Sequence, residues 1–97
     1  MFMRMDKKTV ASDLGFTVHR DDAFTLSYRE GDHVLKFELE LSGVKEYGFL
    51  IYSDSSLSRR WQPPFDQEEV SPEKKRQIVE RVLAAVKFMG EKNPVVM

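Results

Sequence analysis

The sequence predicts an α+β fold: a four- or five-stranded antiparallel meander sheet, followed by one long C-terminal helix packed on one face. Three observations predict it. Apolar and polar residues alternate with period two through much of the first half of the chain, turn-forming residues separate these stretches, and the last third carries a helical apolar stripe behind a clear start signal. Strands that come first and a single helix that comes last are typical of α+β domains.

The length sets the domain count. The chain has 97 residues, which suits one domain over residues 1–97 with one modest core. We expect residues 1–6 to form a loose N-terminal end. Residues 91–97 are expected to form a short tail that either adds an extended segment at the sheet edge or stays loose.

In the first part of the chain, the alternation of apolar and polar residues is weak. Residues 9–14 predict a short helical turn closed by Gly15, and Phe16–Arg20 predicts a strand. In residues 23–29, three side chains that alternate with polar neighbours predict a strand with one core face. They are Phe24, Leu26 and Tyr28.

The strongest alternation in the chain is His33–Leu41, where apolar residues alternate with Lys36, Glu38 and Glu40. Gly31 supplies the hairpin turn before it, and residues 42–46 make the next turn. Residues 47–52 are apolar on both faces and predict a central strand. A last short strand over residues 57–62 would carry Trp61.

The helix has the clearest local signals. Ser71 suits the N-cap, Pro72 suits the first helical position, and Gly90 suits the end. Between them an apolar stripe at helical spacing is expected to face the sheet. It consists of Ile78, Val79, Val82, Ala85, Val86 and Met89.

Composition limits the classes of function. The net charge is −1, from 15 basic and 16 acidic residues, and this balance argues against a nucleic-acid partner, since phosphate contacts need a basic surplus. The chain has no cysteine, so disulfides and thiolate metal sites are ruled out, and a reducing compartment fits. No apolar run is long enough for a signal peptide or a membrane span, so we expect a cytoplasmic protein.

Few residues point to catalysis or metal binding. No nucleophile elbow and no phosphate-binding glycine loop occurs, and we predict no cofactor. His19 and His33 could meet at a metal only if their hairpins aligned, and solvated turn residues are the commoner outcome. The acids that precede the helix could perform acid–base chemistry but also complement the helix dipole. Residues 74–76, a run of basic residues, suit either a phosphate contact or a solvated helix face.

The stretch between the sheet and the helix holds the only tryptophan and two adjacent prolines. Prolines stiffen the chain, so Gln62 to Pro64 is expected to form an extended connection. Trp61 either anchors this crossover by packing or, with Phe65 and the acids, presents a binding surface of aromatic and charged residues. Both roles are compatible.

Three segments together resemble a known family. They are residues 49–53 (FLIYS), residues 61–66 (WQPPFD) and residues 68–72 (EEVSP), followed by a helix that ends in residues 88–90 (FMG). This pattern resembles immunity protein family 74, a family of bacterial immunity proteins that accompany polymorphic toxins, and the resemblance covers about residues 28–90. It implies a short α+β chain that binds and neutralises a cognate toxin.

We therefore predict a non-enzymatic binding protein. The expected contact residues are Arg59, Trp61, Phe65, Asp66, Glu68 and Glu69. A homo-oligomeric structural or regulatory domain, joined through an exposed edge strand as a homodimer, is the alternative. A small enzyme that uses the acidic cluster is a third hypothesis.

Overall fold

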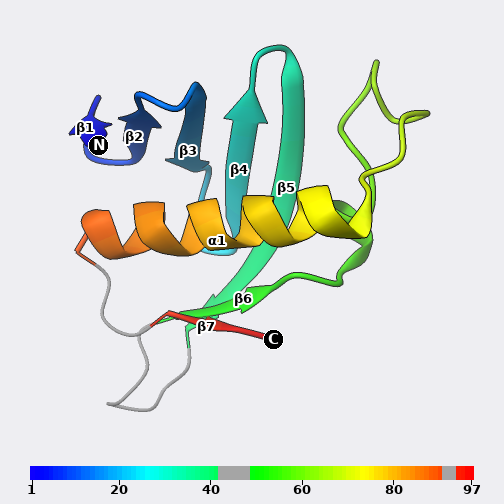
Figure 1. The fold of residues 1–97 in the computed structure, drawn as a ribbon. Coiled ribbons are helices and arrows are strands. Elements are labelled where there is room, and N and C mark those ends of the chain that lie inside the picture. The colour runs from blue at the N-terminus through cyan, green and yellow to red at the C-terminus, as the bar shows by residue number, and fades with distance from the viewer. Residues whose placement is uncertain (42–48, 91–93) are drawn as a thin grey trace.

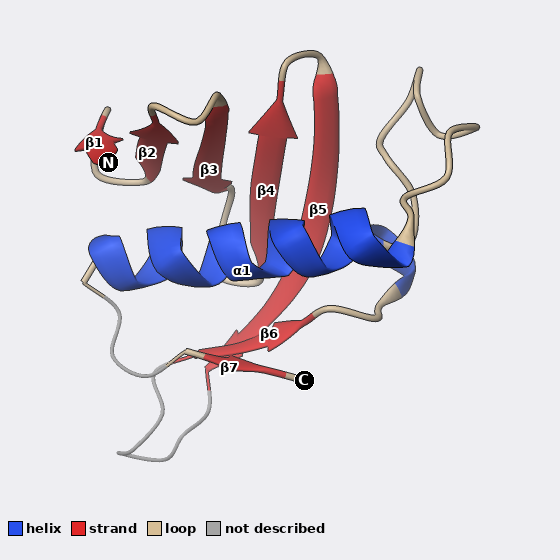
Figure 2. Cartoon of the chain, in the orientation of Figure 1, coloured by secondary structure: helices blue, strands red, loops and turns tan. Residues whose placement is uncertain are grey.

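The computed structural model describes residues 1–41, 49–90 and 94–97 (Figure 1). Seven strands form one sheet in sequence order, and one long helix lies across one face of it (Figure 2). The elements are β1 Phe2–Arg4, β2 Thr9–Ser12, β3 Phe16–Arg20, β4 Thr25–Glu30, β5 His33–Leu41, β6 Phe49–Tyr52, the 3₁₀ helix η1 Ser56–Ser58, α1 Pro72–Phe88 and β7 Val95–Val96.

The mixed fold with a C-terminal helix is confirmed, but the predicted number of four or five strands is wrong. Two of the additional strands come from the N-terminus, where we expected a loose end over residues 1–6 and a helical turn over residues 9–14. Instead β1 and β2 pair antiparallel. Apolar burial explains the difference, because Val10 is buried in the core and the Phe2 ring packs against Phe16 at 5.9 Å between ring centroids.

The last strand pair of the sheet is parallel, whereas an antiparallel sheet was predicted. β7 pairs with β6 in parallel, so the tail does add an extended segment at the sheet edge. The chain between them crosses the sheet through α1, and such a crossover returns a strand parallel to the one it left. The turn expected over residues 42–46 and the start of the strand expected over residues 47–52 lie outside the described residues.

Two smaller predictions are also wrong. Phe24 is 67% exposed rather than on the core face, because its N–H donates to Asp22 Oδ1 at 2.8 Å and holds it in the turn before β4. Residues 57–62 do not form a strand. The buried Ser58 hydroxyl donates to the carbonyl oxygens of Ser53 at 3.0 Å and Ser55 at 3.2 Å, and this curls the chain into η1.

The helix is formed as predicted. The N–H of Lys74 donates to the Ser71 hydroxyl at 3.1 Å, Pro72 begins α1, and Gly90 has a φ of 99° just after its end. The predicted apolar stripe faces the sheet and completes one core. The buried apolar residues are Val10, Phe16, Val18, Leu26, Tyr28, Leu35, Phe37, Leu39, Ile51, Trp61, Ile78, Val82, Ala85 and Val86.

One polar cluster joins the sheet to the helix. Glu30 accepts hydrogen bonds from Tyr28 Oη at 2.6 Å, from Arg81 Nη1 at 3.1 Å, and from Lys74 Nζ at 2.8 Å. Burial and the bond to Glu30 raise the pKa of Tyr28 to about 12. Burial acts to raise the pKa of Glu30, but the hydrogen bonds from Lys74 and Tyr28 and the two cations outweigh it, so the pKa is lowered.

Candidate functional site: the 60–69 loop

The segment between η1 and α1 is a compact closed loop, called here the 60–69 loop. Its two ends meet in an antiparallel bridge between Arg60 and Glu69. Inside it the N–H of Phe65 donates to the Gln62 carbonyl at 3.1 Å, and the N–H of Glu68 donates to the Phe65 carbonyl at 3.0 Å. The extended connection expected here is therefore wrong: the chain turns twice, and the Pro63–Pro64 peptide bond is cis.

The loop lies beside the first half of β5 (Figure 1). In the described register β6 pairs with the second half of β5, from Glu38 onward, and no described strand pairs with the first half on that side. The N–H of Gln62 donates to the Val34 carbonyl at 2.8 Å and satisfies part of this edge. Next to it the Trp61 side chain enters the core and is only 7% exposed. Burial of a large aromatic ring thus fixes the base of the loop.

His33, at the start of β5, holds the loop from the sheet side. Its ring stacks on Phe65 at 3.8 Å between centroids and meets Trp61 edge-on at 5.0 Å. Its Nε2 lies 2.9 Å from Glu68 Oε2. This role could not be predicted from the sequence, because His33 and Glu68 are 35 residues apart and no local pattern links them.

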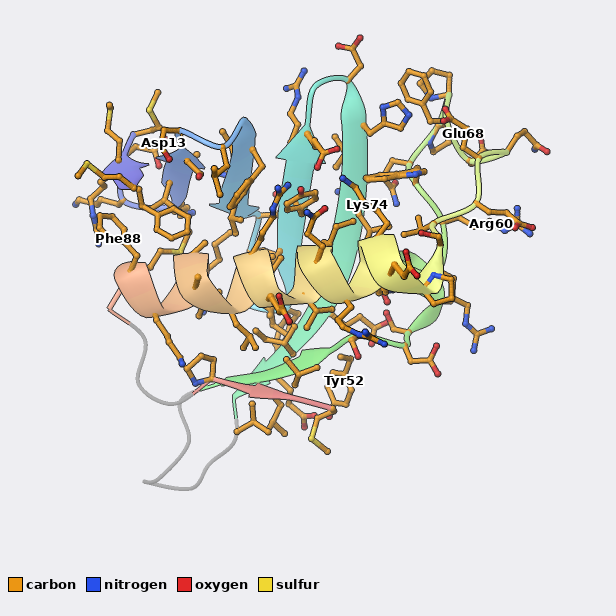
Figure 3. The ribbon with its side chains drawn as sticks, in the orientation of Figure 1. Asp13, Tyr52, Arg60, Glu68, Lys74 and Phe88 are labelled. Carbon is orange, nitrogen blue, oxygen red and sulfur yellow. The ribbon has the colours of Figure 1, made fainter. Side chains whose placement is uncertain are left out.

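The charged side chains in and beside the loop differ in whether they form hydrogen bonds or ion pairs within the chain. Arg60 Nη1 donates to the Asp66 carbonyl at 3.3 Å, and Arg59 Nε lies 3.8 Å from Asp54. Figure 3 labels Arg60 and Glu68, both of which belong to this loop. Within the described ranges, the carboxylates of Asp66 and Glu69 have no ion-pair partner, so they remain available to a ligand or a partner protein.

The structure separates the six predicted contact residues into two groups. Arg59, Glu68 and Glu69 are exposed and Asp66 is half-buried, so these four contribute to the surface. Trp61 is buried and Phe65 is half-buried beneath His33. The packing role considered for Trp61 is therefore the one that the fold supports, and direct contact with a partner through Trp61 or Phe65 stays a prediction.

The two histidines do not form a site together. His19 lies on β3, with β4 between it and β5, and its Nδ1 is 2.6 Å from the Thr9 hydroxyl. In the part of the chain that the structure describes, no three His, Asp or Glu side chains form a group that could hold a metal ion.

The basic run at residues 74–76 is not one solvated face. Lys74 bonds Glu30, while Lys75 donates to the Ser58 carbonyl and lies over the Phe37 ring at 5.6 Å. Burial lowers the pKa of Lys75. Only Arg76 of the three is exposed, which leaves little of the phosphate-binding patch considered from the sequence.

No protein-family model, no curated protein and no solved structure matches this chain. Among the described residues, no helix has the length and apolar character needed to cross a membrane. The resemblance to immunity protein family 74 therefore stays a prediction, and the arguments for a function rest on the loop itself.

Proposed function

We propose that this chain is a non-enzymatic binding protein, an immunity protein that neutralises a cognate bacterial toxin by occupying its surface through the 60–69 loop. One observation carries the proposal: the loop is fixed to the sheet at three points and still presents the carboxylates of Asp66 and Glu69, which pair with no cation among the residues that the structure describes. The three points are the buried Trp61 ring, the bond from Gln62 to Val34, and the His33 contacts.

A loop fixed in this way suits recognition. A flexible loop loses conformational entropy when it binds, and that loss weakens the complex. Here the backbone turns are already closed, so the cost is reduced. Trp61 and Phe65 act as internal supports of the surface, and Asp66 and Glu69 are its contacts.

The charges indicate the chemistry of the partner. The loop carries one basic residue, Arg60, and three carboxylates, so its charge favours a basic partner surface. The three carboxylates belong to Asp66, Glu68 and Glu69. Enzymes that act on polyanions carry such surfaces. The proposed site of action is the cytoplasm of the cell that makes the chain, which agrees with a sequence that has no cysteine.

Affinity capture followed by a growth assay tests this function. The purified chain is used as bait in lysate of its own organism, and the captured protein is expressed in a bacterial host with and without the chain. The proposal expects growth arrest that the chain relieves. Charge reversal at both carboxylates (Asp66→Lys with Glu69→Lys) should weaken binding about 100-fold, if each reversal costs about 1.4 kcal/mol.

A matched control separates the loop from overall charge. Glu38→Lys with Glu80→Lys makes the same change of charge at exposed positions on β5 and α1, away from the loop. Circular dichroism should show the wild-type spectrum for both double variants, which checks that both fold. If the control loses the partner as fully as the loop variant, or if the loop variant still relieves growth arrest, the loop is not the binding surface.

A further inference from the structure

The first strand of the sheet, β1, pairs on one side with β2, and no described strand pairs with its other edge. The N–H of Asp13 donates to the Met1 carbonyl at 3.1 Å, and the N–H of Met5 donates to the Thr9 carbonyl at 2.9 Å. These bonds place residues 1, 3 and 5 in hydrogen-bonded pairs with residues 13, 11 and 9. Phe2 and Arg4 stand in the alternate pairs, so their N–H and C=O groups point away from β2 to the open edge. The edge thus offers two donors and two acceptors.

The same strand exposes a methionine face. Met1, Met3 and Met5 alternate along the chain and therefore lie on one face of the sheet, the face opposite α1. They are 94%, 66% and 61% exposed. On the other face Phe2 packs against Phe88, which is itself 45% exposed at the end of α1 (Figure 3). Edge strands are usually protected by charged side chains or proline, whereas the three side chains that this strand presents on this face are uncharged methionines.

We propose that β1 pairs antiparallel with β1 of a second copy of this chain, about a two-fold axis at Met3. In this register Phe2 of one copy faces Arg4 of the other, and their outward groups form four backbone hydrogen bonds. Met3 faces Met3, and Met1 faces Met5 in both directions. All six methionines then lie in three cross-strand pairs on one face, which is the arrangement that stabilises paired strands.

The second copy is favoured because the edge is self-complementary. Reversing the strand about Met3 matches every outward donor to an acceptor and every exposed methionine to another methionine. On the opposite face it brings the Arg4 guanidinium to the Phe2 ring, a favourable cation–π pair. Isologous contacts of this kind are the commonest route to homodimers. The inference is independent of the 60–69 loop, since no residue of that loop takes part.

Cysteine cross-linking tests the register directly, because the chain contains no native cysteine. Facing residues of a non-hydrogen-bonded pair have Cα atoms about 4.5 Å apart, within disulfide range. Met3→Cys should therefore cross-link to a dimer under mild oxidation. Met5→Cys should not, since four residues along a strand separate the two Met5 positions by about 14 Å. Equal cross-linking of both variants would overturn the register.

Sedimentation velocity over a range of concentrations tests the pairing itself. Arg4→Pro removes an outward N–H that no β2 group needs, and should shift the dimer to monomer, whereas Arg4→Ala should leave most of it. Met3→Glu should also yield monomer, and Phe24→Glu, at an equally exposed site outside β1, should not. A wild-type chain that stays monomeric throughout, or a dimer unchanged by Arg4→Pro, would overturn the proposal.

Discussion

The contacts of Glu30 allow the stability cost of losing its charge to be predicted. We consider the substitution Glu30→Gln, which keeps the shape of the side chain and removes its charge. Glu30 binds both cations of the cluster: Lys74 Nζ lies 2.8 Å from each of its oxygens, and Arg81 Nη1 lies 3.1 Å from one. The amide of Gln keeps one oxygen that can accept a hydrogen bond, but its NH₂ group replaces the other oxygen and faces the cations as a donor. The two cations also lose their counter-charge.

The expected cost is about 2 kcal/mol in the free energy of unfolding. Hydrogen bonds to charged groups are worth about 1.5–3 kcal/mol when lost, and loss of a partner from a fully buried pair costs about 3–5 kcal/mol. Glu30 is 34% exposed, so solvent screens part of the effect and the lower range applies. For a domain of this size, about 2 kcal/mol lowers the Tm by roughly 8–16 °C.

The dependence on pH follows from the lowered pKa of Glu30. A carboxylate whose pKa is lower in the folded state stabilises the fold fully above its unfolded pKa, ordinarily 4.5. This contribution is lost as the pH falls through the lowered folded value. The difference in stability between wild type and Glu30→Gln should therefore be constant from neutral pH down to about pH 5, and should shrink at more acidic pH.

Urea unfolding monitored by the fluorescence of the single, buried Trp61 measures the difference at several pH values. Glu38→Gln is the matched control, because it makes the same change at an exposed position on β5. Its effect should stay within about 0.5 kcal/mol. The reasoning is refuted if Glu30→Gln costs no more than the control, or if its cost does not decrease in acid.

Two further predictions concern packing and capping. Trp61→Ala should cost about 3–5 kcal/mol and be visible as a large fall in Tm by circular dichroism, since the ring is buried; Phe24→Ala, at an exposed aromatic, should change little. If both variants melt alike, Trp61 is not a support of the core. Ser71→Ala should cost about 1 kcal/mol in urea unfolding because the N–H of Lys74 loses its acceptor, whereas Ser71→Gly should cost only a few tenths. A Ser71→Ala variant as stable as wild type would show that the capping bond contributes nothing.

Elements with strong local signals were predicted well from the sequence. The helix depends on Ser71, Pro72 and a stripe at helical spacing, all of which act within a few residues of one another. The long strand His33–Leu41 has an alternation that admits only one buried face. Both elements were predicted in the right place because their periodicity and their caps are properties of the local chain.

Elements that depend on a distant partner were predicted poorly. β1 and β2 are short and weakly patterned, and they are strands because each has a neighbour to pair with and because Phe2 and Val10 reach the core. Residues 57–62 look like a strand in isolation, but the buried hydroxyl of Ser58 bonds nearby carbonyls and turns the chain. Strand formation is decided by packing and pairing more than by intrinsic preference.

The candidate site also has features that follow from the local sequence and features that depend on distant residues. From composition alone, the stretch before the helix was seen to combine a single tryptophan with a cluster of acids, because composition is a local property. Which of these residues face outward depends on contacts between distant parts of the chain. Trp61 enters the core and Phe65 stacks on His33, a residue far away in the sequence. Among the described residues, the carboxylates of Asp66 and Glu69 are left without an ion-pair partner. The physical reason is that a side chain is buried by what the fold brings against it, and His33 meets the loop only after β5 and the helix have taken their places.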